Sequence, residues 1–234
     1  GCAESAVEGS PKVFAELDDH RLVQTQLQKH PLIDILGGFG PDDRRNRIVV
    51  MLTNFFCCAT HSGPIFHTVS YAISCGIPLI AAVTIYSVEG LAGMGGRVAF
   101  GILGDKLGAK HVLVGGLLLQ AFGALAYFFV RDLGAFYAVA ALFGFIYAGV
   151  MPLYAVLARE NFPLRLMGTV IGGTAMAGGL GMATGPVAGG LIYDTYASYG
   201  WLFIGSFGIG IGAFLIAMTF KPFPKPQPQL SPAQ

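Results

Sequence analysis

The residue with the clearest chemical potential in this sequence is Arg97, which lies inside a long apolar stretch. A guanidinium group is unfavourable in the hydrocarbon core of a membrane, so an arginine at that depth usually has a function. Its planar fork of donors matches the geometry of a carboxylate. Arg97 therefore predicts a binding site for a small anion. The alternatives are a side chain that extends to the membrane interface or a structural ion pair.

Three further titratable residues lie in apolar stretches. Glu89 precedes Arg97 by eight residues, which on a helix means about 12 Å along the axis and about 80° around it. A direct ion pair is therefore not expected, although both can line one cavity. Glu89 is a candidate carrier of a coupled proton, or else a carboxyl bonded to a neighbouring helix. His61 and His67 are also proton-coupling candidates, because imidazole titrates near neutral pH; the alternative is structural hydrogen bonding.

A stripe of larger side chains is a weaker candidate for substrate contact. Tyr147, Met151 and Tyr154 follow the i, i+4, i+7 spacing of one helix face. Such a stripe more often packs against a neighbouring helix than against a ligand. Tyr147 is taken as the candidate substrate contact.

Composition limits the class of protein that can carry these residues. Of 234 residues, 54% are hydrophobic and only 12% are charged, too few charges for a soluble globular enzyme. The net charge of +1 gives no indication of a nucleic-acid partner. The four cysteines lack the spacing of a metal site or a disulfide framework. No phosphate-binding loop or hydrolase motif occurs, so neither a cofactor nor an enzymatic activity is expected.

Residues 48–220 form the apolar body of the chain. Apolar segments of about 20 residues are long enough to cross a bilayer as helices, and strand-like alternation is absent. The sequence therefore predicts an all-α membrane protein with six transmembrane helices. The predicted spans are Ile48–Ile73, Leu79–Leu103, Val112–Val130, Leu133–Leu157, Leu166–Tyr193 and Trp201–Phe220.

The flanking segments set the expected orientation in the membrane. Residues 1–47 form a polar arm without the features of a signal peptide, and residues 221–234 form a Pro-rich tail expected to be disordered. If the arm is cytoplasmic, the segments on its side of the membrane carry twelve Lys and Arg, and the opposite loops carry only Arg131. The positive-inside rule then places both termini in the cytoplasm, with the protein in the cell membrane.

A glycine-rich motif lies between the second and third spans. It reads Gly101-Ile-Leu-Gly104-Asp105-Lys106-Leu-Gly108-Ala-Lys110. Gly101 permits close helix contact, Gly108 permits a tight turn, and Asp105 can accept hydrogen bonds from a neighbouring helix terminus or pair with a base. The alternative is an ordinary basic hairpin that obeys the positive-inside rule.

This motif resembles the signature loop of the major facilitator superfamily, roughly G-x-x-x-D-R/K-x-G-R/K-R/K, with Ala109 in place of a base. In that superfamily the loop acts as a conformational latch, which implies this role for Gly101, Asp105, Lys106, Gly108 and Lys110. The loop follows the second helix and, more weakly, the eighth helix of twelve. Because a long polar arm precedes the first span, the chain resembles the C-terminal half of the 6+6 fold. The resemblance implies a missing N-terminal six-helix half as its partner.

A narrower resemblance comes from His61-Ser-Gly-Pro-Ile-Phe-His67 and from Gly96-Arg97. These segments are similar to bacterial carriers of the monocarboxylate porter and oxalate:formate antiporter type. The resemblance implies secondary active transport of a small organic anion by alternating access. Arg97 would hold the substrate with His67 and Tyr147, and Glu89, His61 or His67 would carry a coupled proton.

Several alternatives stay open at this point. Symport and antiport are both compatible with the residues, but a monocarboxylate is favoured because the fifth span contains no lysine. This chain alone lacks half of the pathway and is expected not to transport by itself. The protein could instead be a non-transporting receptor or assembly module on the same fold. An intramembrane enzyme is disfavoured because no paired catalytic residues converge.

Overall fold

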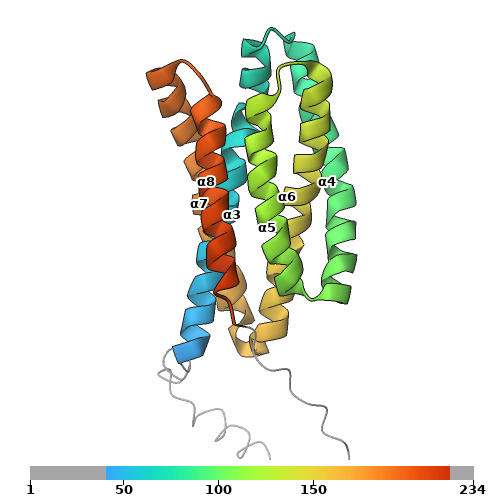
Figure 1. Cartoon of the computed structure of the whole chain (residues 1–234). Helices are drawn as coiled ribbons and strands as arrows, with labels where there is room; N and C mark the ends of the chain where they lie inside the picture. The colour runs from blue at the N-terminus through green and yellow to red at the C-terminus, as the bar shows by residue number, and fades with distance from the viewer. Residues whose placement is uncertain (1–40, 222–234) are drawn as a thin grey trace, which may run out of the picture. The chain divides into compact units, whose positions relative to one another are not determined.

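The computed structural model describes residues 41–221, and every regular element in that range is helical. The long helices are α3 (Pro41–Ser74), α4 (Leu79–Leu107), α5 (Ala109–Ala126), α6 (Leu133–Asn161), α7 (Met167–Tyr196) and α8 (Gly200–Met218), and two single 3₁₀ turns are η1 (Tyr127–Phe129) and η2 (Leu164–Leu166). The six long helices run side by side (Figure 1). All six are long and apolar enough to cross a membrane, which confirms the six predicted spans.

The helix ends differ from the predicted spans, because hydropathy marks only the apolar part of a helix. α3 begins at Pro41, seven residues before the predicted start at Ile48, so the end of the predicted polar arm is helical. Proline is suited to a first helical turn, where its missing N–H is not needed. α4 and α6 continue four residues beyond the predicted ends, through charged residues that need no apolar surroundings. Residues 1–40 of the arm and 222–234 of the tail lie outside the described residues.

The predicted loop over residues 104–111 is reduced to one residue. α4 ends at Leu107 and α5 begins at Ala109, with Gly108 between them at φ 88°. This left-handed conformation favours glycine because it has no Cβ atom. The Gly108 N–H donates to the carbonyl of Gly104 and closes the last turn of α4. The tight turn expected at Gly108 is therefore confirmed.

Helix α3 is the central element of the described bundle, because it contacts each of the other five long helices. The contacts are Tyr86 to Ile65 for α4, Gln120 to Cys57 for α5, Tyr147 to His61 for α6, Thr174 to Asn54 for α7 and Leu202 to Gly63 for α8. Side chains on α3 can therefore meet groups from any part of the bundle.

Two glycine seams bring pairs of helices into direct backbone contact. At Gly93, Gly96, Gly144 and Gly149 an added Cβ would overlap atoms across the α4–α6 seam, and at Gly178, Gly181, Gly185 and Gly189 it would overlap atoms of α3. Close approach of this kind is typical of membrane helices, where small residues replace bulky ones at the contact. Gly181, Gly185 and Gly189 therefore permit a close crossing of α7 with α3.

Other glycines of the described bundle lie on helix faces that no described residue covers. At Gly168, Gly172, Gly208 and Gly212 an added Cβ would meet no atom of the described residues within 4 Å. Gly101, expected to permit a close helix contact, is likewise open on that side. Glycine spacing indicates a smooth helix face, but it does not say whether another helix covers that face.

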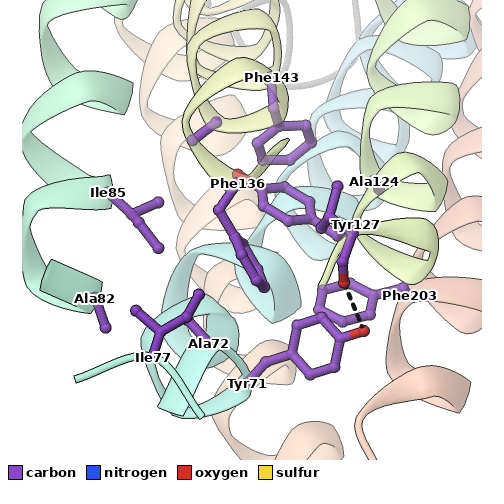
Figure 2. Close-up of a cluster of buried hydrophobic side chains, with 12 residues drawn as sticks. Tyr71, Ala72, Ile77, Ala82, Ile85, Ala124, Tyr127, Phe136, Phe143 and Phe203 are labelled. Atoms are coloured by element: carbon purple, nitrogen blue, oxygen red, sulfur yellow. Dashed lines mark hydrogen bonds between the residues drawn. The ribbon is translucent and has the colours of Figure 1, made fainter. Parts of the chain in front are cut away.

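A cluster of buried aromatic side chains packs together in the core, near the α5–α6 connection (Figure 2). Tyr127 and Phe203 stack with ring centroids 5.6 Å apart, and Tyr71, Phe136 and Phe143 pack around them. The Tyr71 hydroxyl donates to the carbonyl of Val130 at 3.3 Å, drawn as a dashed line in Figure 2. Aromatic pairs of this geometry contribute about 0.5–1.5 kcal/mol each beyond the area that they bury.

Arg131, the single base on the predicted outer side, has a structural explanation in this cluster. Its guanidinium donates to the Tyr71 hydroxyl and, at 2.8 Å each, to the carbonyls of Phe128 and Val130. The group also lies 5.5 Å from the centroid of the Tyr71 ring. Arg131 therefore connects the α5–α6 turn to α3 through hydrogen bonds.

Candidate functional site

Tyr147 is the point where the predicted site residues come together. It lies on α6, and its ring stacks on the His61 ring of α3 with centroids 5.0 Å apart and planes inclined by 26°. Phe143, one turn earlier on α6, lies 5.6 Å from the Tyr147 centroid. Tyr147 is only half-buried, so part of its side chain is accessible.

Glu89 on α4 is buried, with 2% of its surface exposed. Neither carboxylate oxygen has a hydrogen-bond partner among the described residues. The phenols of Tyr86, Tyr127 and Tyr147, from α4, η1 and α6, lie in its vicinity. The Tyr127 hydroxyl is also buried, near the Thr68 hydroxyl of α3. Buried polar atoms are normally paired, so the unpaired Glu89 carboxylate makes this level of the α4–α6 seam a candidate functional site.

Arg97 lies about two turns beyond Glu89 on α4, and its side chain is exposed in the described bundle. The Tyr147 phenol is within electrostatic range of both the Arg97 guanidinium and the Glu89 carboxylate. The two charged groups thus act on one aromatic residue without pairing with each other. This agrees with the expectation that they do not form an ion pair along the helix.

A cavity of about 170 Å³ continues this surface along α6. Met151 and Tyr154, the next residues of the predicted stripe, line it together with Asn54 of α3 and Thr174 of α7. The Asn54 amide donates to the carbonyl of Thr174 at 2.7 Å and joins two walls of the cavity. Tyr147 therefore packs on His61, whereas Met151 and Tyr154 line the cavity.

His67 does not join this group. Its ring packs against Gly189 of α7 and lies 5.2 Å from the ring of Tyr199, near the α7–α8 connection. The Tyr86 hydroxyl of α4 donates to the carbonyl of Ile65 on α3, and this contact serves as a common height for the two helices. From that level Arg97 lies eleven residues along α4, and His67 lies two residues along α3 in the opposite direction, so their heights differ by about 20 Å. The structure brings His61, Tyr147, Glu89 and Arg97 together and leaves His67 apart.

The signature motif occupies the α4–α5 end of the bundle. Asp105 and Lys106 are exposed on the last turn of α4, and Asp105 makes no hydrogen bond or ion pair with any described residue. Lys110 is half-buried in the first turn of α5 and lines a small apolar pocket with Val50 of α3. The helix-terminus contact or ion pair expected for Asp105 is therefore not formed within residues 41–221.

Comparison with known protein families decides what this bundle is. The family model described as Major Facilitator Superfamily matches residues 19–183 and, in a second match, residues 82–234. The chain belongs to the major facilitator superfamily. Its six long helices form one half of the superfamily's fold, and the protein is a multi-pass membrane protein.

Individual superfamily members resemble the chain at a moderate level. The sialic acid transporter NanX of Escherichia coli is 29% identical over 154 residues, which is 65% of this chain and 35% of NanX. The riboflavin transporter RibZ of Clostridioides difficile is 28% identical over 54% of this chain and 27% of its own length. An uncharacterised major facilitator transporter of Bacillus subtilis, YuxJ, is 26% identical over 58% of this chain. The chain matches about a third of the length of these curated relatives.

The sequence prediction missed one residue, Gln120, which contacts His61 at the candidate site. Gln120 of α5 is fully buried and lies 3.1 Å from the Nδ1 atom of His61, measured from its amide nitrogen. It is the only amide side chain in the predicted span Val112–Val130. That isolation was a usable signal, because a buried amide needs hydrogen-bond partners from a neighbouring helix.

Proposed function

We propose that this chain is the C-terminal six-helix half of a secondary transporter, which moves a small organic anion across the membrane by alternating access. Membership of the superfamily supports transport in general, and the match to about a third of each relative's length supports a partial chain. The relatives are named for sialic acid and for riboflavin, so their names do not narrow the substrate. The substrate class proposed here rests on the residues of the site.

The observation that carries the proposal is the convergence of Arg97, Glu89 and His61 on Tyr147. Arg97 would bind the carboxylate of the substrate through its planar donors, and the Tyr147 hydroxyl would add a hydrogen bond. Arg97 is the only Lys or Arg inside the six predicted spans, so one carboxylate is the natural complement. This supports a monocarboxylate, bound on the half-exposed side of Tyr147.

Glu89 is the proposed carrier of a coupled proton. A carboxylate without hydrogen-bond partners in a low-dielectric interior is much more favourable when it is neutral. A proton taken up together with the anionic substrate would remove both isolated charges at once. Of the three predicted coupling residues, Glu89 is near Arg97 through Tyr147, whereas His67 is distant. Exchange of one anion for another, without a proton, is the alternative coupling.

The remaining half would cover the exposed faces of α4 and α7. Transporters of this class bind substrate near the membrane midplane, between repeats that move against each other. Exposed residues on α4 include Leu91, Met94 and Val98, and open glycines on α7 include Gly172 and Gly179. A second six-helix half packed there would enclose Arg97, and the motif from Gly101 to Lys110 would act as its latch.

The orientation belongs to the same proposal. We place the α4–α5 turn, the polar arm over residues 1–47 and the tail over residues 221–234 on the cytoplasmic side of the cell membrane. The support is the excess of Lys and Arg on that side, together with the structural role of Arg131 on the other side.

The decisive experiment uses the full-length transporter in proteoliposomes, with Arg97→Lys, Arg97→Ala and the control Met94→Ala. Met94 is 67% exposed on the same helix and has no proposed contact with substrate. Loss of a charge-assisted hydrogen bond of about 1.5–3 kcal/mol predicts a roughly ten- to hundredfold loss of monocarboxylate affinity for Arg97→Ala. Arg97→Lys should recover only part of it, because lysine lacks the bidentate fork.

Two results would contradict the proposal. Binding and uptake of labelled monocarboxylates that survive both Arg97 substitutions would favour a non-transporting receptor or assembly module. Uptake by proteoliposomes that contain only the 234-residue chain would refute the need for a second half.

A further inference from the structure

Gln120 is held by three polar contacts in the core between α5 and α3. Its amide nitrogen Nε2 donates to the carbonyl of Cys57 at 2.9 Å and lies 3.1 Å from Nδ1 of His61. The Cys57 thiol donates to the amide oxygen Oε1 at 3.4 Å. Gln120 and His61 are both buried, with 0% and 3% of their surfaces exposed, so water does not replace these contacts.

The partners of the amide determine which way it faces. A backbone carbonyl can only accept a hydrogen bond, so the Cys57 carbonyl requires the amide nitrogen rather than the oxygen. One of the two hydrogens on Nε2 is used there, and the other points to Nδ1 of His61. An amide nitrogen has no acceptor capacity, so Nδ1 must be the acceptor in this contact. The imidazole proton then lies on Nε2.

We propose that Gln120 is a positioning residue that keeps His61 neutral, with its proton on Nε2, and so excludes His61 from carrying the coupled proton. A charged imidazolium carries a hydrogen on Nδ1 as well. That hydrogen would point directly at the N–H of Gln120, and neither group could accept it. Turning the amide around would place Oε1 against the Cys57 carbonyl, so the network has no relaxed arrangement for charged His61.

The groups around His61 are consistent with this assignment. The Cys57 carbonyl on its own helix accepts from Gln120 and also lies near the ring, and α5 contributes only the neutral amide. α6 contributes the Tyr147 ring, stacked face to face with the imidazole. From α4, Glu89 and Arg97 act on Tyr147 rather than contacting the imidazole. Among residues 41–221 no carboxylate hydrogen-bonds to His61, so no anionic side chain in the described bundle pairs with a positive charge on it.

The inference deepens the proposed function and rests on it for its consequence. A fixed, neutral His61 keeps its ring plane against Tyr147, which holds the tyrosine beside Glu89 and Arg97. The coupled proton is then left to Glu89, and His61 acts only by positioning the phenol that meets the substrate.

The test is a spectroscopic measurement that needs no substrate. The full-length transporter is labelled with ¹⁵N-histidine in lipid nanodiscs, and the His61 signals are assigned by their loss in His61→Gln. We expect a neutral imidazole protonated on Nε2 throughout the range in which free histidine titrates, around pH 5 to 8. In Gln120→Glu the new carboxylate can accept from Nδ1, so His61 should become an imidazolium over part of that range.

Transport measurements give a second, separate readout. His61→Gln should keep the shape of the wild-type pH profile of uptake, because the residue that it removes does not titrate. Gln120→Glu should shift that profile, whereas a merely structural role for Gln120 would lower the rate without moving it. A wild-type His61 that titrates, or that carries its proton on Nδ1, overturns the inference. A neutral Nε2–H tautomer in a protein that transports no anion would instead contradict the proposed function.

Discussion

Glu89 on α4 packs directly against Gly144 on α6, where a Cβ atom would collide with both the backbone and the side chain of the glutamate. The glycine is therefore what permits a carboxylate to lie buried at this level of the seam. Because the same contact holds α4 close to α6, the position of the acidic group and the packing of the two helices depend on one another.

This contact predicts that Gly144→Ala destabilises the protein. The added methyl group must displace α4, and overpacking of this kind typically costs about 1–3 kcal/mol. The matched control is Gly115→Ala on α5, where an added Cβ meets nothing within 4 Å. It should be neutral or stabilise the helix by up to about 1 kcal/mol. Thermal unfolding of the full-length transporter in detergent measures both, and equal loss in the two variants would contradict the assignment of the seam.

Glu89→Gln should separate proton coupling from substrate binding. The amide matches the shape of the neutral acid but cannot take up or release a proton. Accumulation driven by a pH gradient should therefore fall by about tenfold or more, equivalent to at least ~1.4 kcal/mol of lost coupling. Exchange of labelled for unlabelled substrate, which needs no net proton movement, should persist. Loss of exchange together with accumulation would assign Glu89 to binding, and an unchanged accumulation would support anion exchange as the mechanism.

Tyr147→Phe should weaken substrate binding without loosening the site. The ring and its stacking on His61 remain, while the hydroxyl that would meet the substrate is lost. A single hydrogen bond of about 1 kcal/mol corresponds to a roughly fivefold loss of affinity. Equilibrium binding of the labelled anion provides the measurement, with unfolding temperature as the check on packing. Tyr147→Leu, which also removes the stacking, should lower both quantities.

His67→Gln provides the complementary case. The structure separates His67 from Arg97 by roughly 20 Å along the bundle, so substrate affinity in this variant should stay within about twofold of wild type, less than ~0.5 kcal/mol. A loss of substrate affinity as large as that of Arg97→Ala would place His67 in the substrate site and would contradict its separation from Arg97.

The proposed orientation can be tested by thiol labelling in a background without the native cysteines. Lys106→Cys, at the end of α4, should react with a membrane-impermeant maleimide only after the cells are opened. Ser198→Cys, which is exposed between α7 and α8, should react in intact cells. The reverse pattern would place the termini on the outside and would contradict the use of the positive-inside rule for this chain.

Features that depend on nearby residues could be predicted from the sequence. Six apolar segments indicate six helices because the hydrophobic requirement of a membrane is met residue by residue. The turn at Gly108 follows from a motif in which glycine separates two helical stretches. The helix ends were less predictable, because charged residues such as Lys106 continue a helix beyond its apolar part.

Features that depend on contacts between distant segments could not be predicted in the same way. Helix geometry places Glu89 and Arg97 about 80° apart around α4. Nothing in the sequence shows that Tyr147 of α6 lies near both charged groups. The spacing of Gly168 and Gly172 matches that of Gly181 and Gly185, yet only the second pair meets α3. Which glycine face is covered is decided by the arrangement of whole helices.

The single-residue connection at Gly108 couples the positions of the two helices that carry the signature motif. A long linker would let the ends of α4 and α5 move apart, whereas Gly108 alone keeps the two helix ends next to each other. Asp105 and Lys110 thus lie on either side of a connection of one residue, and Lys110 lines a pocket together with Val50 of α3. In the proposed latch, a partner that binds Asp105 would therefore move α4 and α5 together as one helical hairpin.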